Sequence, residues 1–479
     1  MARRKLPARI ERGGRLAAPA CLVATILGVA ALVVLPTRAL AVAVIPHRPA
    51  PAGLPWLEVR SGLITNSQGQ RVILRGFNDD ALLETGSKPL PPPLSAGDAQ
   101  LMEEEGFDVV RIPISWSLLE PQPGHFSTGY LNQIADMVAV CSAHHLYAVL
   151  DMHTEDFGVG FGGSGAPAWL NVPGVPNLHL PGISAAWQRH LSPAVNAALA
   201  YFWLYPNWQK LYWQAWTFVA RRFRGDSNVA GYDLYNEPHP LPIPPGIFAT
   251  RLLWPFYAEG IKAVSAVDPN HLFIVEGDLF GEYPTAVTPL RAADLVFSTH
   301  LYAGSILGSP FTGSAAPLES EWTQALGEAQ QLPAPYWVGE MGIERTQPLA
   351  SKWAEDELAL ANSHLAGWAW WEWDDSQSWG VRQNGGPIHS AWLRVLSQPF
   401  VRSSPGRLTS MSYQPSTSRL SATVTMAPPG SRVQVSWPMT SGRPRLISGC
   451  VRELSSRESS PGLVTLVMLR SSCRIILRG

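Results

Sequence analysis

The chain contains few charged residues and shows no excess of either charge sign. Charged residues make up 15% of its 479 residues, the formal net charge is −1, and Lys and Arg form no basic stripe along the sequence. Because binding to a phosphate backbone requires clustered Lys and Arg, we expect no nucleic acid among its partners. The length suits one large domain followed by a small one.

Cysteine is also scarce. Four cysteines are too few for a disulfide scaffold, and no Cys/His cluster has zinc-ligand spacing. We therefore predict no metal and no cofactor. Cys141 lies in a predicted helix and is expected to be a buried free thiol. Cys450 and Cys473 lie in the C-terminal tail and can pair after export, although spacing alone does not establish that bridge.

The signature turns of two large enzyme classes are missing as well. The sequence has no Gly-x-Ser-x-Gly elbow, which argues against a serine esterase. It has no glycine-rich phosphate turn after an early strand, as a dinucleotide-binding open sheet requires. The glycine run at 158–163 is not followed by Lys-Ser/Thr, so it does not indicate a nucleotide cradle.

The N-terminus has the layout of an export signal. Six basic residues precede an uncharged stretch over 16–36, and small residues around Ala41 fit a cleavage site. We predict a signal peptide over 1–43, a proline-containing linker over 44–55 and a secreted protein. The uncharged stretch approaches the length of a membrane span, so tethering by an uncleaved segment is the alternative.

The residues after the linker repeat a pattern in which a short apolar run is followed by a helix-like stretch. Alternation of strands and helices predicts a parallel sheet, and eight such units favour an α/β fold of the (β/α)8 TIM-barrel type over 56–398. A doubly wound open sheet is the structural alternative. The predicted strands are Val72–Phe77, Val109–Ile114, Ala148–Met152, Val229–Tyr235, Leu272–Glu276, Leu295–His300, Tyr336–Glu340 and Gly367–Glu372.

Two segments depart from this repeat. Residues 157–207 are rich in Gly, Pro and aromatics and are expected to form a long functional loop with little secondary structure. Residues 399–479 are rich in Ser, Thr, Arg and Val, with alternating runs at 421–426, 432–437 and 463–469. This alternation predicts a small C-terminal antiparallel β-sandwich domain. We expect it to pack against the barrel, with carbohydrate or surface binding as the alternative role.

Polar side chains stand where the predicted strands end, and in a barrel these ends converge on one site. Glu237 and Glu340 end apolar strands, where a carboxylate without a partner would be costly to bury. Retaining glycoside cleavage requires such a pair: a carboxyl of raised pKa as acid and a charged carboxylate as nucleophile, roughly 5–5.5 Å apart. The further candidates are Arg111, His153, Asn236, His300, Tyr302 and Trp371.

Each of these residues also has an ordinary structural reading. Arg111 can be a structural ion pair, His153 a buried histidine with satisfied hydrogen bonds, and Trp371 one more core member among the 19 tryptophans. Taken together in strand order, they favour a sugar-binding site. Within it, Arg111 is expected to keep Glu340 ionised, and Asn236 to bind a sugar 2-hydroxyl.

At these motifs the sequence resembles glycoside hydrolase family 5, a family of (β/α)8 retaining glycosidases. The resemblance implies that Glu237 is the acid/base, that Glu340 is the nucleophile, and that the other six candidates form the subsite floor. It covers roughly 56–400. The matching motifs are Leu74-Arg75-Gly76-Phe77-Asn78, Gly106-Phe107-Asp108-Val109-Val110-Arg111-Ile112-Pro113, Tyr235-Asn236-Glu237-Pro238, His300-Leu301-Tyr302 and Gly339-Glu340.

Within that family the chain looks most like the endoglycoceramidases, which release an intact oligosaccharide from ceramide. The resemblance rests on the segments 150–153, 161–169 and 367–375 and on the tail around 409–413. Those enzymes usually carry Gln-Asp after the histidine, whereas here Thr154-Glu155-Asp156 follows His153, and the loop from Asp79 onward also differs. A galactosylceramide-cleaving branch therefore stays open.

The expected function is hydrolysis of the bond between oligosaccharide and ceramide in glycosphingolipids by a double displacement that uses two Glu residues. We expect the enzyme to be a monomer. The expected partner is a glycolipid or oligosaccharide substrate, with membrane-surface contact as an option. The alternatives are an endo-β-glucanase or β-glucosidase acting on non-lipid β-glucans, and an inactive secreted carbohydrate-binding protein. Intact Glu237 and Glu340 argue against the last of these.

Overall fold

The computed structural model describes residues 53–84, 92–178, 192–240, 242–278, 290, 292–375, 377–454 and 461–479. The predicted signal peptide over 1–43 and the linker up to residue 52 lie outside the described residues. Among the described helices, none is both long and apolar enough to cross a membrane. Residues 50–479 form one compact unit.

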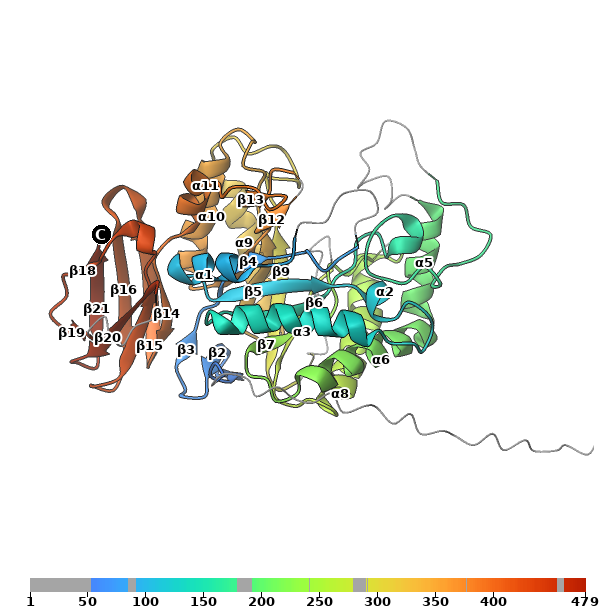
Figure 1. Cartoon of the computed structure of the whole chain (residues 1–479), viewed down its shortest axis with the longest axis horizontal. Coiled ribbons are helices and arrows are strands. Elements are labelled where there is room, and N and C mark those ends of the chain that lie inside the picture. The colour runs from blue at the N-terminus through green and yellow to red at the C-terminus, as the bar shows by residue number, and fades with distance from the viewer. Residues whose placement is uncertain are drawn as a thin grey trace, which may run out of the picture. The chain divides into compact units, whose positions relative to one another are not determined.

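Eight parallel strands close into a barrel, which confirms the predicted fold (Figure 1). Their pairing follows the chain, since β4 pairs with β5 and so on to β11, which returns to β4. The strands carry almost continuous buried side chains, as expected of parallel strands covered by helices. They are β4 (Arg75–Asn78), β5 (Val109–Ile114), β6 (Tyr147–Met152), β7 (Val229–Asp233), β8 (Leu272–Glu276), β9 (Leu295–Leu301), β10 (Tyr336–Met341) and β11 (Gly367–Trp370).

The covering helices bury one apolar face each. In α3 (Thr128–Ala143) the buried positions recur every three or four residues, and Ser127 caps the helix by accepting a hydrogen bond from the backbone N–H of Tyr130. The other described helical elements before residue 399 are α1 (Ala96–Glu104), α2 (Trp116–Leu119), η1 (Val159–Phe161), α5 (Pro193–Leu204), α6 (Pro206–Phe223), α7 (Pro245–Phe248), η2 (Ala249–Leu253), α8 (Trp254–Ser265), α9 (Ala316–Gln331), α10 (Ala350–Ser363) and α11 (Ser390–Leu396).

The segment 157–207 is more ordered than the sequence suggested. Its last part forms α5 and the start of α6, so the expectation of little secondary structure is wrong there. The reason is packing, because Phe202 and Trp203 of α5 are buried against Tyr212 of α6 and Phe256 of α8. Residues 179–191 of this segment lie outside the described residues.

The predicted first strand, Val72–Phe77, is divided between two sheets. Its start belongs to β3 (Arg71–Val72), which pairs with β14 (Phe400–Ser404) of the C-terminal segment, and only its end belongs to the barrel. Strands β1 (Leu57–Arg60) and β2 (Leu63–Asn66) continue the same seven-stranded sheet. Residues 57–72, which the sequence assigned to the barrel domain, are therefore hydrogen-bonded into the C-terminal β structure.

The C-terminal segment forms two antiparallel sheets around a second apolar core, as predicted. The seven-stranded sheet adds β17 (Arg432–Ser436), β20 (Leu463–Met468) and β19 (Val451–Glu453) to β14. The other sheet contains β15 (Arg407–Gln414), β16 (Arg419–Thr425), β21 (Cys473–Arg478) and β18 (Arg445–Leu446). Outside both, β12 (Asp374–Asp375) pairs with β13 (Arg382–Gln383), and the helical turns η3 (Pro415–Thr417) and η4 (Met439–Ser441) connect strands.

The two predictions about cysteine agree with the structure. Cys450 and Cys473 form a disulfide with a Cα–Cα distance of 5.6 Å, and Cys141 is a buried free thiol.

The C-terminal β structure meets the barrel where the barrel strands begin. Arg402 of β14 forms an ion pair of 3.1 Å with Asp108, the residue just before β5. The candidate site residues lie at the opposite end of the barrel, where the strands finish.

Candidate active site

All eight residues selected from the sequence lie at the end of the barrel where the strands finish. Arg111 projects from β5, His153 follows β6, and Asn236 and Glu237 follow β7. His300 lies in β9, Tyr302 just after it, Glu340 in β10 and Trp371 directly after β11. Because parallel strands bring their carboxyl ends to one rim, residues far apart in the sequence meet here.

Glu340 is held from three sides. Arg111 Nη1 donates to its Oε1 at 2.7 Å, and the Tyr302 hydroxyl donates to its Oε2 at 2.9 Å. His300 Nδ1 lies 3.4 Å from the same Oε2. Burial, followed by the negative charge of Glu340, raises the pKa of Tyr302, so the phenol keeps the proton that it donates. These donors fix both carboxylate oxygens of Glu340.

Glu237 is more accessible than Glu340. Its side chain is 31% exposed against 6% for Glu340, and its backbone has a φ of 45°, which is uncommon for a residue other than glycine. His300 Nδ1 contacts its Oε1 at 2.8 Å, and its backbone N–H donates to Glu276 Oε2 at 2.8 Å. The left-handed backbone and the bond to Glu276 thus set the direction of this side chain.

The pKa of Glu237 differs from the sequence-based expectation. Burial raises it, but the hydrogen bond from His300 and the charge of His300 lower it more, so that the net pKa lies below the ordinary value. Burial lowers the pKa of His300, while the charges of Glu276 and Glu340 and the bond to Glu237 raise it well above its usual range. The raised pKa expected for Glu237 is therefore wrong for this arrangement, in which the proton resides on His300.

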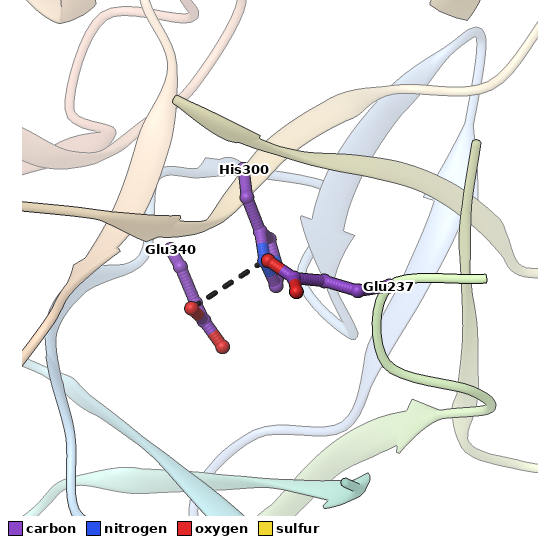
Figure 2. A group of neighbouring side chains, drawn as sticks. All are labelled: Glu237, His300 and Glu340. Atoms are coloured by element: carbon purple, nitrogen blue, oxygen red, sulfur yellow. Dashed lines mark hydrogen bonds and ion pairs between the residues drawn. The ribbon is translucent and has the colours of Figure 1, made fainter. Parts of the chain in front are cut away.

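The carboxyl groups of Glu237 and Glu340 lie close together, and His300 Nδ1 contacts both (Figure 2). One oxygen of each carboxylate and a ring nitrogen of His300 all lie within 4.8 Å of one another. An oxygen–oxygen approach within this bound favours the roughly 5–5.5 Å carboxyl separation of retaining glycosidases over the roughly 6.5–9.5 Å of inverting ones.

Arg111 lies at the centre of the floor and is fully buried. Besides Glu340, its guanidinium contacts Asp233 at 3.0 Å, Asp151 at 3.1 Å and Glu276 at 3.2 Å. Burial lowers its pKa, but these four carboxylates raise it well above the ordinary value. One cation thus offsets several buried negative charges and at the same time orients the carboxylate of Glu340.

Asn236 and His153 complete the floor. Arg111 Nη2 donates to Asn236 Oδ1 at 2.9 Å, and Asn236 Nδ2 donates to the Thr154 carbonyl at 3.1 Å. These two bonds fix the orientation of the amide and use one of its two amide hydrogens. His153 bonds through Nδ1 to Asp151 at 2.8 Å and stacks on Trp371 with ring centroids 5.7 Å apart.

The comparisons with known proteins decide the family. The family model described as cellulase (glycosyl hydrolase family 5) matches residues 66–377, well over half of the chain.

The chain belongs to glycosyl hydrolase family 5.

Among curated family relatives, Endoglycoceramidase I of Rhodococcus hoagii (strain 103S) is 23% identical over 362 residues, which cover 64% of this chain and 66% of the relative. The endoglycoceramidase of Cyanea nozakii is 24% identical over 43% of this chain and 47% of its own length. The match therefore covers just under two thirds of the length of the first relative and less than half of the length of the second.

The solved structures agree in fold. A crystal structure of endogalactoceramidase is 26% identical, with a TM-score of 0.73 over 89% of this chain and 100% of that one. Endo-glycoceramidase II from Rhodococcus sp., in its ganglioside GM3 complex, is 24% identical, with a TM-score of 0.76 over 88% of this chain and 99% of that one. At that identity the second likeness concerns the fold.

Three carboxylates of this family 5 site were not selected from the sequence. Asp151, Asp233 and Glu276 surround Arg111, and Glu276 also lies 3.2 Å from His300 Nε2. The signal for Glu276 was present, because it ends the predicted strand 272–276 just as Glu340 ends another. Asp151 and Asp233 lie inside the predicted strands 148–152 and 229–235, where the sequence does not show which face of the strand points inward.

Two groups of described side chains have the spacing of metal ligands. Glu237, His300 and Glu340 form one group, and Asp151, Asp233 and Glu276 form the other. In the first group His300, whose pKa is raised, supplies a positive charge. In the second group Arg111 contacts all three carboxylates. The protein's own cations therefore offset these charges, and the prediction that no metal is used stays a prediction.

Proposed function

We propose that the chain is a retaining β-glycosidase of the endoglycoceramidase type, with Glu340 as nucleophile and Glu237 as acid/base. The observation that carries the proposal is that one oxygen of Glu237 and one oxygen of Glu340 lie within 4.8 Å of each other, with His300 in contact with both residues. At this spacing Glu340 reaches the anomeric carbon while Glu237 reaches the leaving oxygen, without room for a water between carboxylate and sugar.

The first step requires a proton on Glu237. His300 Nδ1–H contacts Glu237 Oε1 at 2.8 Å, so a short transfer converts the charged pair into a neutral histidine and a neutral acid. Substrate binding excludes water, and a drier site favours the neutral pair over two separated charges. After the transfer His300 keeps its Nε2 proton toward Glu276, which lies 3.2 Å away, and its Nδ1 accepts from Glu237.

Glu340 then attacks the anomeric carbon while Glu237 protonates the leaving oxygen. The result is a glycosyl group on Glu340 and a free alcohol. Glu237 next removes a proton from water, which attacks the same carbon and releases the sugar. Through both steps Arg111 and Tyr302 hold the two oxygens of Glu340, and Asn236 offers an N–H to a sugar hydroxyl.

Exposed apolar side chains at the same end of the barrel support a lipid as the leaving group. Four such side chains are 52–55% exposed: Leu204 at the end of α5, Tyr205 between α5 and α6, Ile247 in α7 and Ile306 after β9. All four lie on segments that follow the carboxyl ends of barrel strands, where substrates of this fold bind. Exposed apolar side chains at this end of the barrel can contact an acyl or sphingoid chain. The endoglycoceramidase and endogalactoceramidase relatives point to the same class of substrate.

The experiment is product analysis on a ganglioside, a galactosylceramide-series lipid and cello-oligosaccharides. We expect an intact oligosaccharide and free ceramide from a lipid, and no product with Glu340→Gln. Glu357→Gln is the matched control, because Glu357 is buried in α10 and bonds to Trp322, away from the site. Cleavage of cello-oligosaccharides alone would keep the carboxylate roles and remove the lipid specificity. No cleavage of any substrate would contradict the proposal.

A second measurement tests retention directly. A 2-deoxy-2-fluoro glycoside with a good leaving group slows release of the covalent intermediate, and we expect the added mass on the peptide that contains Glu340. Labelling elsewhere would contradict the assignment.

We also propose that the chain is exported by its N-terminal segment. Intact-mass measurement of the secreted protein tests this proposal. A mass that includes residues 1–43 would indicate tethering instead.

A further inference from the structure

The four-stranded sheet of the C-terminal segment has one face in the core and one face outward. Along β16 and β21 buried and outward positions alternate, and Leu420, Ala422, Ile475 and Leu477 belong to the apolar core. The outward positions carry five arginines, which we call the arginine face. They are Arg407, Arg419, Arg445, Arg474 and Arg478.

Strand pairing places three of these arginines in one row. Arg419 of β16 lies opposite Arg478 of β21, and Arg478 lies opposite Arg445 of β18. Neighbouring strands are only about 4.8 Å apart, so three like charges stand side by side, an arrangement that destabilises a sheet. The sequence showed no basic stripe because these residues are separated by 26 to 59 positions and meet only through this register.

The charge of the row is not offset within the described residues. There, none of the five guanidinium groups takes part in an ion pair, and Arg419 Nε is buried without a hydrogen-bond partner. Residues 399–479 hold eleven arginines, no lysine, no aspartate and two glutamates. Of the two, Glu453 lies in β19, on the other sheet. The remaining 398 residues have a net charge of −10, so the positive charge is concentrated in this one segment.

The neighbours of the arginines indicate which kind of anion fits. Ser412 lies opposite Ser421, and Thr423 lies opposite Arg474, so hydroxyl groups fill the face between the guanidinium groups. Ile476 is the single aliphatic side chain at the outward positions of β16 and β21, which gives little to insert into a membrane. The described outward positions carry no aromatic ring on which a nucleic-acid base could stack.

The position of the arginine face also argues against its binding the membrane that presents the substrate. Arg402 and Asp108 join this β structure to the barrel where the strands begin, whereas Glu237 and Glu340 lie where the strands finish. A surface bound at the arginine face therefore does not lie at the mouth of the site.

We propose that the arginine face, with its row Arg419–Arg478–Arg445 and the intervening hydroxyls, binds an anionic polysaccharide that carries repeated carboxylate or sulfate groups. The planar guanidinium forms paired hydrogen bonds to such groups, and the hydroxyl side chains bond to sugar hydroxyls. Bound polymer offsets the like-charge row and holds the enzyme on an acidic matrix while the barrel mouth stays open. The proposal is independent of the substrate proposed above.

The experiment measures binding of the full chain to polygalacturonate and to dextran sulfate, with neutral dextran as the reference, at low and at physiological salt. We expect the double variant Arg419→Ser/Arg478→Ser to bind at least tenfold more weakly than wild type. The matched control is Arg432→Ser/Arg452→Ser, which removes the same charge from exposed positions of the other sheet and should bind within about twofold of wild type. The glycosidase activity of all variants should be unchanged.

Three results would overturn the proposal: equal binding to neutral dextran, equal loss of binding in the control variant, or tighter binding to phosphatidylserine vesicles or single-stranded DNA than to either polysaccharide. Removing opposed arginines relieves repulsion, so the double variant should melt no lower than wild type. If it does melt lower, Arg445→Ser/Arg474→Ser gives a second test at other positions of the same face.

Discussion

Arg111→Met removes a buried cation that four carboxylates contact. The partners Asp151, Asp233, Glu276 and Glu340 lie 2.7–3.2 Å from the guanidinium. Removing one partner of a buried ion pair costs about 3–5 kcal/mol, because the remaining charge has no counter-charge. Unfolding entropy of about 2.1 cal/mol/K per residue over the ordered chain converts this cost into a melting temperature lower by roughly 3–6 °C.

The pH dependence of that loss has a definite sign. Burial and the charge of Glu276 raise the pKa of Asp233 well above its ordinary value, and Arg111 opposes that rise. Without Arg111, Asp233 binds a proton more readily in the folded than in the unfolded protein, so acid restores stability. The deficit of Arg111→Met should therefore be largest at neutral pH and should shrink as the pH falls toward the ordinary carboxylate range.

The assay is thermal unfolding of wild type, Arg111→Met and Arg111→Lys at pH 5 and pH 7.5. Turnover of a soluble aryl glycoside is measured in parallel. Lysine retains the charge, so its stability deficit should depend less on pH. Its single ammonium cannot reach all four carboxylates, so its turnover should still fall. A melting temperature of Arg111→Met within about 1 °C of wild type at pH 7.5 would refute the account of Arg111 as the central counter-charge.

Three further variants probe the catalytic groups. Glu237→Gln should lose about 10²–10⁴-fold in turnover of a lipid glycoside, which needs leaving-group protonation, and far less on a dinitrophenyl glycoside, and azide should restore part of the rate. Tyr302→Phe deletes the 2.9 Å bond to Glu340, and the loss of a hydrogen bond to a charged group, about 1.5–3 kcal/mol, predicts roughly 10–150-fold lower kcat/KM. Glu276→Gln removes a charge that raises the pKa of His300, so the basic limb of the pH profile should move to lower pH.

Glu357→Gln serves as the control for the three, because burial raises the pKa of Glu357 to about 8 in α10, away from the site. It should leave the pH profile and the azide response unchanged. An azide effect in Glu357→Gln, or an unmoved basic limb in Glu276→Gln, would contradict these roles. So would equal losses of Glu237→Gln on both leaving groups.

The barrel could be predicted because its strands are continuous apolar runs. Seven of the eight predicted strands have their counterparts within a few residues. The first was misplaced at its start, because Val72 and Phe77 look alike in hydrophobicity although they lie in different sheets. Which sheet a strand joins depends on its partner, here β14, more than 300 residues later in the chain. No local pattern contains that information.

The site was predictable in its members and not in its protonation. Strand ends mark Glu237, His300 and Glu340 as neighbours, since the barrel brings such ends together. The pKa of Glu237 instead depends on a 2.8 Å contact with His300, and that of His300 on Glu276. These contacts follow from side-chain directions that spacing in the sequence does not give.

The arrangement of charges explains how an acid of lowered pKa fits the proposed mechanism. Before reaction, a protonated His300 lies between the two carboxylates Glu237 and Glu340, which gives the three groups a net charge of −1. Once Glu237 has delivered the proton and Glu340 carries the sugar, His300 and Glu340 are neutral, Glu237 is charged, and the net charge is again −1. The buried surroundings, fixed around Arg111, therefore meet the same total charge in both states. No additional net charge has to be created in this buried site, where an uncompensated charge would be costly. The proton on His300 is thus compatible with acid catalysis by Glu237, because it is the pair, and not Glu237 alone, that must hold it.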